Sequence, residues 1–246
     1  MKKRTPQRPR HGKANALVIV LIVVGGGFFF LFVCGGVLVA LLLPAIAAAR
    51  HTAQQAVVSN NMKQIGLALH MYHEVYHSLP PVYVADENGK PMHSWRVLIL
   101  PFLERQDLYE SYDFDEPWDG PTNSMMMAAR PEVYADPRVS DDDGTKTTFQ
   151  AIAGPGALFD PTVPKVSFAD VTDGISNSAA VVENCADPVV WTKPDDTSPE
   201  EFVNGFTVGN APMQEIVVLR GDGSISVVPK EQLPTLKGWT TRAGND

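Results

Sequence analysis

The chain has 246 residues and carries 20 basic and 28 acidic side chains, for a formal net charge of −8. Six basic residues and no acid lie in the first 13 positions, so the rest holds 14 basic against 28 acidic residues, a net charge of −14. Because residues 14–246 are strongly acidic, they should repel phosphate backbones. Nucleic acid is therefore excluded as an expected ligand. Only two cysteines occur, Cys34 and Cys185, and the first lies in an apolar run, so no disulfide is expected in the remainder.

The apolar run extends without a charged residue from Ala14 to Ala49. A hydrocarbon layer of roughly 30 Å needs about 20 apolar helical residues, so the run predicts one transmembrane helix at 14–44, with the lipid bilayer as partner. Basic residues stay on the cytoplasmic side, which makes residues 1–13 a cytoplasmic basic tail and everything beyond the span extracytoplasmic. The expected location is the cell inner membrane, single-pass. A cleaved signal peptide is the alternative, because Ala45–Ala49 can imitate its cleavage site.

Residues 45–80 are predicted to form a stalk helix that continues the span. Ile65, Leu69, Tyr72 and Tyr76 follow one another at spacings of four, three and four, which places them on one helix face. Two prolines in Ser78-Leu79-Pro80-Pro81 end the helical pattern. The helix therefore has an apolar face that must be buried against a domain.

Residues 81–246 are predicted to be that domain, extracytoplasmic and of the α+β class, with an antiparallel β-sheet on the stalk helix. Short helices are expected at Ser94–Leu100, Phe102–Tyr109 and Glu231–Arg242. The expected strands are Thr148–Ala153, Ser178–Glu183, Phe206–Val208, Glu215–Arg220 and Ser224–Val228. The last two should form a tight hairpin, because Asp222-Gly223 supplies a residue that tolerates positive φ.

Several stretches carry a resemblance to a known family. The stretches are Leu41–Ala45, Ser59–His73, Ser94–Glu104, Tyr112–Asp119, Thr172–Asn177 and Trp191–Pro194. They closely resemble a large planctomycete family of pilin-like, pseudopilin-related proteins of unknown function, sometimes labelled as bacterial solute-binding proteins. The resemblance implies a pilin-like fold and an envelope location, and it implies no established biochemical role.

Two features of that family are missing. Its members begin with a prepilin signal, a Gly-Phe junction followed by a glutamate, but here the only such junction, Gly27-Phe28, lies inside the apolar run with no acid after it. The basic tail is therefore expected to stay attached. The family also ends in a His-x9-Asp-Gly motif, whereas here Asp222-Gly223 is present and Pro212 stands at the histidine's position. We therefore do not expect a role that depends on that histidine.

One local motif suggests metal chemistry. His73-Glu74-Val75-Tyr76-His77 places two histidines one helical turn apart with a glutamate between them, which matches the zinc-protease pattern. The helix ends immediately afterwards, and Glu87 or Glu104 would have to serve as an arbitrary third ligand. We therefore expect no metal site here and no enzyme.

Acid-rich turns are a second candidate, because calcium prefers oxygen ligands. They are Asp141-Asp142-Asp143-Gly144 and the group Asp113, Asp115, Glu116 and Asp119. Neither has the spacing of a helix-loop-helix calcium site, so solvated turns without a cofactor are expected. Met125-Met126-Met127 is interpreted as core packing and Ser176 as a turn serine with no base.

Three functions of different classes remain open. The favoured one is a membrane-anchored pilin-like envelope protein of structural or interaction type, with protein partners in the envelope or self-association. The second is a solute-binding ectodomain, which would need a pocket of several hundred Å³ with converging polar groups. The third is a membrane-anchored zinc metalloprotease.

Overall fold

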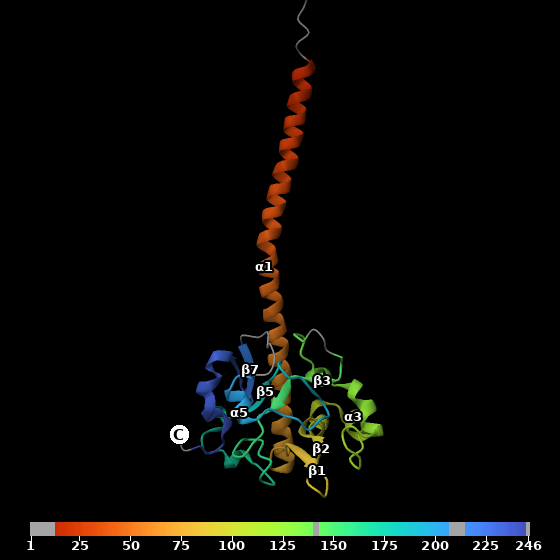
Figure 1. Cartoon of the computed structure of the whole chain (residues 1–246), viewed down its shortest axis with the longest axis vertical. Helices are drawn as coiled ribbons and strands as arrows, with labels where there is room; N and C mark the ends of the chain where they lie inside the picture. Colours follow the sequence, from red (N-terminus) through yellow and green to blue (C-terminus); the bar gives the residue numbers. More distant parts are fainter. Residues whose placement is uncertain (1–12, 140–142, 207–214, 245–246) are drawn as a thin grey trace, which may run out of the picture. The chain divides into compact units, whose positions relative to one another are not determined.

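The computed structural model describes residues 13–139, 143–206 and 215–244 (Figure 1). The basic tail, Asp141-Asp142 and Pro212 lie outside these ranges, as do the side chains at positions 13–17, 29, 31 and 33–39. The chain divides into two compact units, residues 1–53 and 54–246. The described part of the first unit is helical throughout, since α1 runs Lys13–Tyr76 and continues through Pro44. Within the part of the chain that the structure describes, no helix has the length and apolar character needed to cross a bilayer.

The second unit is a mixed helix and sheet domain, which confirms the predicted α+β class. Its main sheet has four antiparallel strands in the order β4-β5-β7-β8. These strands are β4 Phe149–Ala151, β5 Ala179–Glu183, β7 Glu215–Arg220 and β8 Ile225–Pro229. Two smaller antiparallel pairs accompany it, β1 Tyr83–Ala85 with β2 Pro91–Ser94 and β3 Lys146–Thr147 with β6 Val189–Val190.

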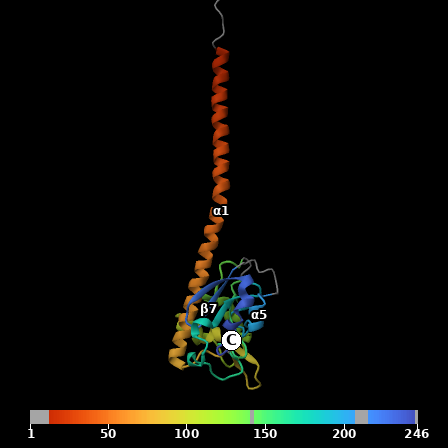
Figure 2. The ribbon, with the colours of Figure 1, turned by 90° about the vertical axis from the view of Figure 1, so that its left-hand side faces the viewer.

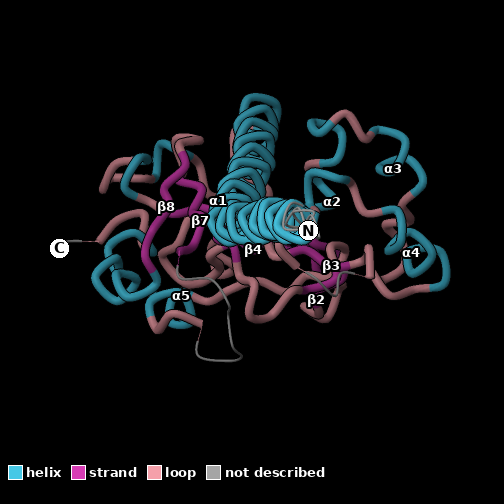
Figure 3. Tube along the Cα trace, turned by 90° about the horizontal axis from the view of Figure 1, so that it is seen from above, coloured by secondary structure: helices cyan, strands magenta, loops and turns pink. Residues whose placement is uncertain are grey.

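The remaining elements are short helices. The α-helices are α2 Trp95–Leu98, α3 Gln106–Ser111, α4 Pro121–Met126 and α5 Pro199–Val203. The 3₁₀ helices are η1 Leu100–Leu103, η2 Met127–Ala129, η3 Glu132–Tyr134, η4 Phe168–Asp170, η5 Ile175–Asn177 and η6 Lys230–Thr240. In Figures 1 and 3, α3 lies on the opposite side of the domain from β7 and α5.

The main sheet is covered on both faces. Val217 and Leu219 of β7 belong to one core cluster together with Met62, Ile65 and Leu69 of α1. The alternate β7 residues belong to a second cluster, with Phe202 of α5 and Leu233 of η6. Figure 2 shows the lower part of α1 and α5 on opposite sides of β7. The predicted burial of the stalk face against a sheet is therefore confirmed for Ile65 and Leu69, while Tyr72 is half-buried and Tyr76 is exposed.

A small residue allows this close packing of helix on sheet. A Cβ added to Gly66 would lie 2.9 Å from Leu219 Cδ1, too close for a normal contact. The glycine lets the backbone of α1 approach β7 directly.

The hairpin prediction is confirmed. Glu215–Arg220 is a strand with the predicted bounds, it pairs with β8, and Gly223 in the turn has a φ of +82°. Ser94 also caps a helix as expected, since its side chain accepts a hydrogen bond from Arg96 N. Both features depend on residues close together in the sequence.

Three helix or strand predictions are wrong or fall outside the described ranges. Phe102–Tyr109 is not one helix, because Glu104 has a φ of 59° and separates η1 from α3. The expected C-terminal helix is the 3₁₀ helix η6, which contains Pro234 and is kinked at Leu236. The expected strand Phe206–Val208 lies outside the described residues except for Phe206, which belongs to no strand.

Replacing Leu69 by alanine should lower the free energy of unfolding by about 2–5 kcal/mol, because the substitution leaves a cavity between α1 and the sheet. Leu67→Ala is the matched control on the same helix, since Leu67 is exposed. Chemical denaturation of the purified chain measures both. Equal midpoints for the two variants would contradict the packing described here.

Candidate functional site

A buried polar cluster lies where the segment after η3 meets the end of β5. We call it the Asp136 cluster, formed by Asp136, Arg138, Glu183 and Cys185. Arg138 Nε donates to Asp136 Oδ1 at 3.0 Å and Arg138 Nη2 to Asp136 Oδ2 at 2.9 Å. The same Nη2 also contacts Glu183 Oε1. One guanidinium therefore bridges two buried carboxylates.

Neighbouring elements hold the cluster in place. Thr148 Oγ1, next to β4, donates to Asp136 Oδ2 at 3.1 Å. Cys185 Sγ donates to Glu183 Oε1 at 2.8 Å, and Val217 N of β7 donates to Glu183 Oε2 at 3.2 Å. The cluster thus ties the segment after η3 to three strands of the main sheet.

The charges of the cluster are unbalanced, because two carboxylates share one guanidinium. Burial raises the pKa of Glu183, and the nearby Asp136 raises it further against the opposing effect of Arg138. Burial also raises the pKa of the Cys185 thiol, with the Glu183 and Asp136 carboxylates adding to the shift. The thiol is therefore protonated at neutral pH and is a poor nucleophile.

The same side chains include a possible ligand set for a metal ion. One ligand atom each of Asp136, Glu183 and Cys185 lies within 4.8 Å of the others. However, Arg138 already occupies the cationic position between the two carboxylates, and the thiol would have to lose its proton. The geometry is that of a buried ion-pair network rather than of an open metal site.

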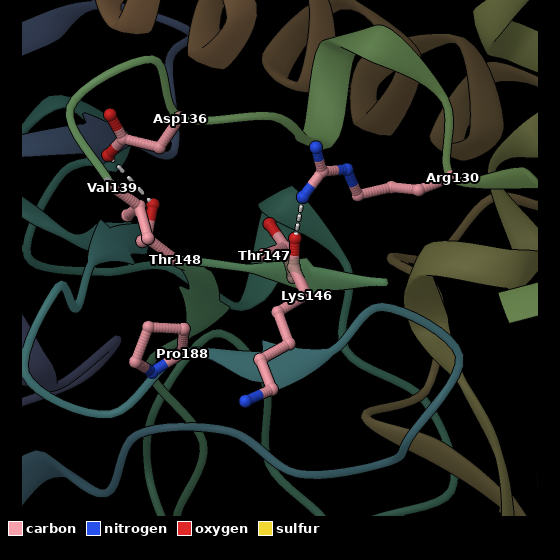
Figure 4. Close-up of a pocket in the computed structure, with 7 residues that line it drawn as sticks. All are labelled: Arg130, Asp136, Val139, Lys146, Thr147, Thr148 and Pro188. Atoms are coloured by element: carbon pink, nitrogen blue, oxygen red, sulfur yellow. Dashed lines mark hydrogen bonds between the residues drawn. The ribbon is translucent and has the colours of Figure 1, made fainter. Parts of the chain in front are cut away.

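A pocket of about 190 Å³ adjoins the cluster (Figure 4). Its lining residues are Arg130, Asp136, Val139, Lys146, Thr147, Thr148 and Pro188. The guanidinium of Arg130 and the carboxylate of Asp136 lie on opposite sides of it, and Arg130 donates to the carbonyl of Lys146. The volume is below the 300–1,000 Å³ typical of small-molecule sites.

Other depressions occur in the described part of the domain. One of about 230 Å³ is lined by Tyr83, Asp160 and several prolines. The Asp160 carboxylate is already hydrogen-bonded, since it accepts from Thr162 and Arg242. Another, of about 390 Å³, lies between α5 and η6 and is lined by Pro199, Val203 and Lys237 among others.

A second buried network joins two of the stretches that carry the family resemblance. Arg96 Nη2 donates to Asp196 Oδ1 at 2.6 Å, and Trp95 Nε1 donates to the same oxygen at 3.0 Å. Arg96 also donates to the carbonyls of Phe149 and Lys193. Burial raises the pKa of Asp196 to about 6 despite the adjacent guanidinium.

The structure does not bring the zinc-protease motif together as a ligand set. His73 Nε2 accepts a hydrogen bond from Phe168 N at 3.3 Å and lies 3.0 Å from Ser167 Oγ. Its lone pair is therefore engaged by η4. Helix α1 ends at Tyr76, and His77 follows with a φ of 55°, so it leaves the helix face that the motif requires.

The described residues of the acid-rich turns serve local hydrogen bonds. Glu116 Oε1 accepts from the backbone N–H groups of Thr122 and Asn123 in the first turn of α4. Asp143 Oδ1 accepts from Thr145 in the same way. These carboxylates order turns and a helix start, as acidic residues commonly do.

One family model matches part of the chain. Residues 47–161 match a family model named SBP_bac_10 and described as a protein of unknown function (DUF1559). No curated protein and no solved structure matches the chain. The matched range includes Arg96, Asp136 and Arg138, but Glu183, Cys185 and Asp196 lie beyond it. The match agrees with the resemblance to a family of unknown function and supplies no activity.

Replacing Arg138 by alanine should lower the free energy of unfolding by about 3–5 kcal/mol, because two buried carboxylates lose their counter-charge. Arg105→Ala is the matched control, since the ion pair between Arg105 and Asp107 is exposed and should be worth about 0–1 kcal/mol. Urea denaturation of both variants measures the difference. An Arg138→Ala variant as stable as the control would show that the Asp136 cluster does not stabilise the fold.

The protein purified without chelators should contain no stoichiometric zinc bound by His73, Glu74 and His77, because His73 is engaged and His77 lies beyond the helix. Elemental analysis of the wild type and of His77→Ala measures this. One zinc per chain in the wild type that disappears in the variant would establish the site.

Proposed function

We propose that the chain is a membrane-anchored, pilin-like envelope protein of structural or interaction type. The observation that supports it best is helix α1, whose residues after Gln54 bury one face against the main sheet, while Leu67, Met71 and Val75 are exposed among the polar side chains of another face. A helix used only as a core element would have a polar outer face. This one offers a surface to a partner.

The proposed anchor rests on the sequence of the first unit. The uncharged run Ala14–Ala49 is long enough for one pass through a bilayer, and the basic residues before it favour a cytoplasmic N-terminus. The domain after it would then be extracytoplasmic, at the cell inner membrane. The pilin-like character is supported by a long N-terminal helix whose C-terminal part packs on an antiparallel sheet.

A role without catalysis is supported by the state of the reactive groups. The Cys185 thiol is held protonated, and the carboxylates of the Asp136 cluster are bound to Arg138. These groups stabilise one another and do not converge on a substrate-sized cavity.

Solute binding is the second candidate, and the pocket beside Asp136 is the observation that favours it. The polar side chains of Lys146, Thr147 and Thr148 line it. Its small volume makes the interaction role the better proposal.

The full-length chain should remain in the membrane fraction after an alkaline carbonate wash and enter solution only with detergent. Phe28→Arg combined with Phe30→Arg should release it, since each charge near the middle of a span costs about 2.5–3.5 kcal/mol. Val227→Arg, on an exposed position of β8, is the control that should stay bound.

Intact mass of the extracted protein tests the same proposal independently. The basic tail should be present. Release of the wild type by carbonate, or a mature chain that begins at Phe28 with an N-methylated phenylalanine, would overturn the uncleaved anchor.

A further inference from the structure

Residues 135–138, which we call the strap, contact α1 through two backbone carbonyls. Asn61 Nδ2 donates to the carbonyl of Ala135 at 3.0 Å, and Gln54 Nε2 donates to the carbonyl of Pro137 at 2.9 Å. The two donors are seven residues apart in the sequence, so the strap follows about two turns of the helix. Both donors are neutral amides, so these contacts do not change with pH.

The charged side chains of the strap hold it to the main sheet through the Asp136 cluster. Arg138 forms an ion pair with Glu183 of β5. Thr148, next to β4, donates to Asp136 Oδ2 at 3.1 Å, and Figure 4 shows this hydrogen bond beside the pocket. The strap therefore joins α1 to the sheet, and its contacts with the sheet depend on ionised groups.

The cluster has an excess negative charge when both carboxylates are ionised. Asp136 accepts two hydrogen bonds from the Arg138 guanidinium, at 3.0 and 2.9 Å, so this carboxylate alone already matches the single positive charge. The Asp136 and Glu183 side chains are each only 1% exposed, and a buried charge without a counter-charge is costly. A proton bound by Glu183 removes the excess and leaves one ion pair.

The other described groups that hydrogen-bond to Glu183 carry no charge. Cys185 Sγ donates to Oε1 at 2.8 Å and stays protonated, and Val217 N of β7 donates to Oε2 at 3.2 Å. Glu215, two residues before Val217, is an exposed carboxylate that accepts from Gln55 of α1 at 3.1 Å. These neighbours therefore do not neutralise Glu183.

The positive charge that acts on Glu183 comes from Arg138. Arg130 and Lys146 also line the adjoining pocket, but they lie across it from Asp136 (Figure 4). Burial raises the pKa of Glu183, Arg138 lowers it, and the Asp136 carboxylate raises it again. The net direction is upward, which agrees with the excess negative charge.

We infer that the Asp136 cluster is a proton-binding site that holds the strap, and through it α1, more firmly to the main sheet in acid than at neutral pH. Glu183 in the unfolded chain has its ordinary pKa of 4.5, which is below its raised pKa in the fold. The stability contributed by the cluster is therefore fully present below pH 4.5 and is lost as the pH rises through the raised pKa. This regulation goes beyond the proposed structural role and does not depend on the membrane anchor.

Urea denaturation of the full chain in detergent, from about pH 5 to about pH 8, tests the inference. Glu183→Gln cannot ionise, so the ratio of the wild-type to the variant unfolding constant should rise about tenfold or more over this range. Glu215→Gln is the matched control, since it removes an exposed carboxylate from the neighbouring strand, and its ratio should stay constant. A Glu183→Gln ratio that stays constant, or that falls as the pH rises, would overturn the inference.

Two measurements on the wild type do not require the Glu183→Gln variant to fold. The carboxyl carbon of Glu183, followed by NMR, should titrate with a midpoint above 4.5. Hydrogen exchange of the strap, corrected for the intrinsic rate, should slow in acid. A midpoint at or below 4.5, or strap protection that does not increase in acid, would overturn the inference. So would a stoichiometric metal ion that is lost in Cys185→Ser, because the ion would then take the place of the proton.

Discussion

The interior of the domain depends on one buried ion pair, between Arg96 and Asp196. Neither side chain is exposed to solvent, and a charge that is removed from water needs a close partner of opposite sign. Asp196 Oδ1 also accepts from Ala151 N at the end of β4, and Arg96 donates to the carbonyl of Phe149 at its start. The pair therefore fixes the edge strand of the main sheet against α2. Because β4 is an edge strand of the sheet on which α1 packs, the ion pair also helps to position that sheet.

Structural features that depend on only a few neighbouring residues were predicted well from the sequence. The Asp222-Gly223 turn determines its hairpin because positive φ is a local requirement, and Ser94 caps α2 because its hydroxyl reaches a backbone N–H two residues on. The buried stalk face was predictable for a related reason, since helical periodicity places Ile65 and Leu69 together whatever packs on them. Prediction failed at Glu104, where a left-handed residue interrupts a pattern that looks helical.

The candidate site could not be predicted in this way. Asp136 and Cys185 are 49 residues apart, and Arg96 and Asp196 are 100 apart, so nothing in the local pattern relates them. Only the segment Asp136-Pro137-Arg138 carries a local signal, an acid and a base two residues apart across a proline turn. The local zinc-protease motif of His73 and His77, which the sequence analysis rejected as a metal site, was the nearest local signal, and the two residues do not share a helix face in the structure. Proximity along the chain was a poor guide to the polar contacts made by the fold.

The packing of α1 on β7 also determines the order in which the protein can fold. His70 binds the carbonyl of Gly221, and Gln55 binds Glu215, across 151 and 160 residues of chain. A ribosome adds about 5–20 residues per second, so the apolar face of the helix waits on the order of 10 s for the strands that cover it. The nascent helix therefore spends the whole of domain synthesis with its inner face uncovered.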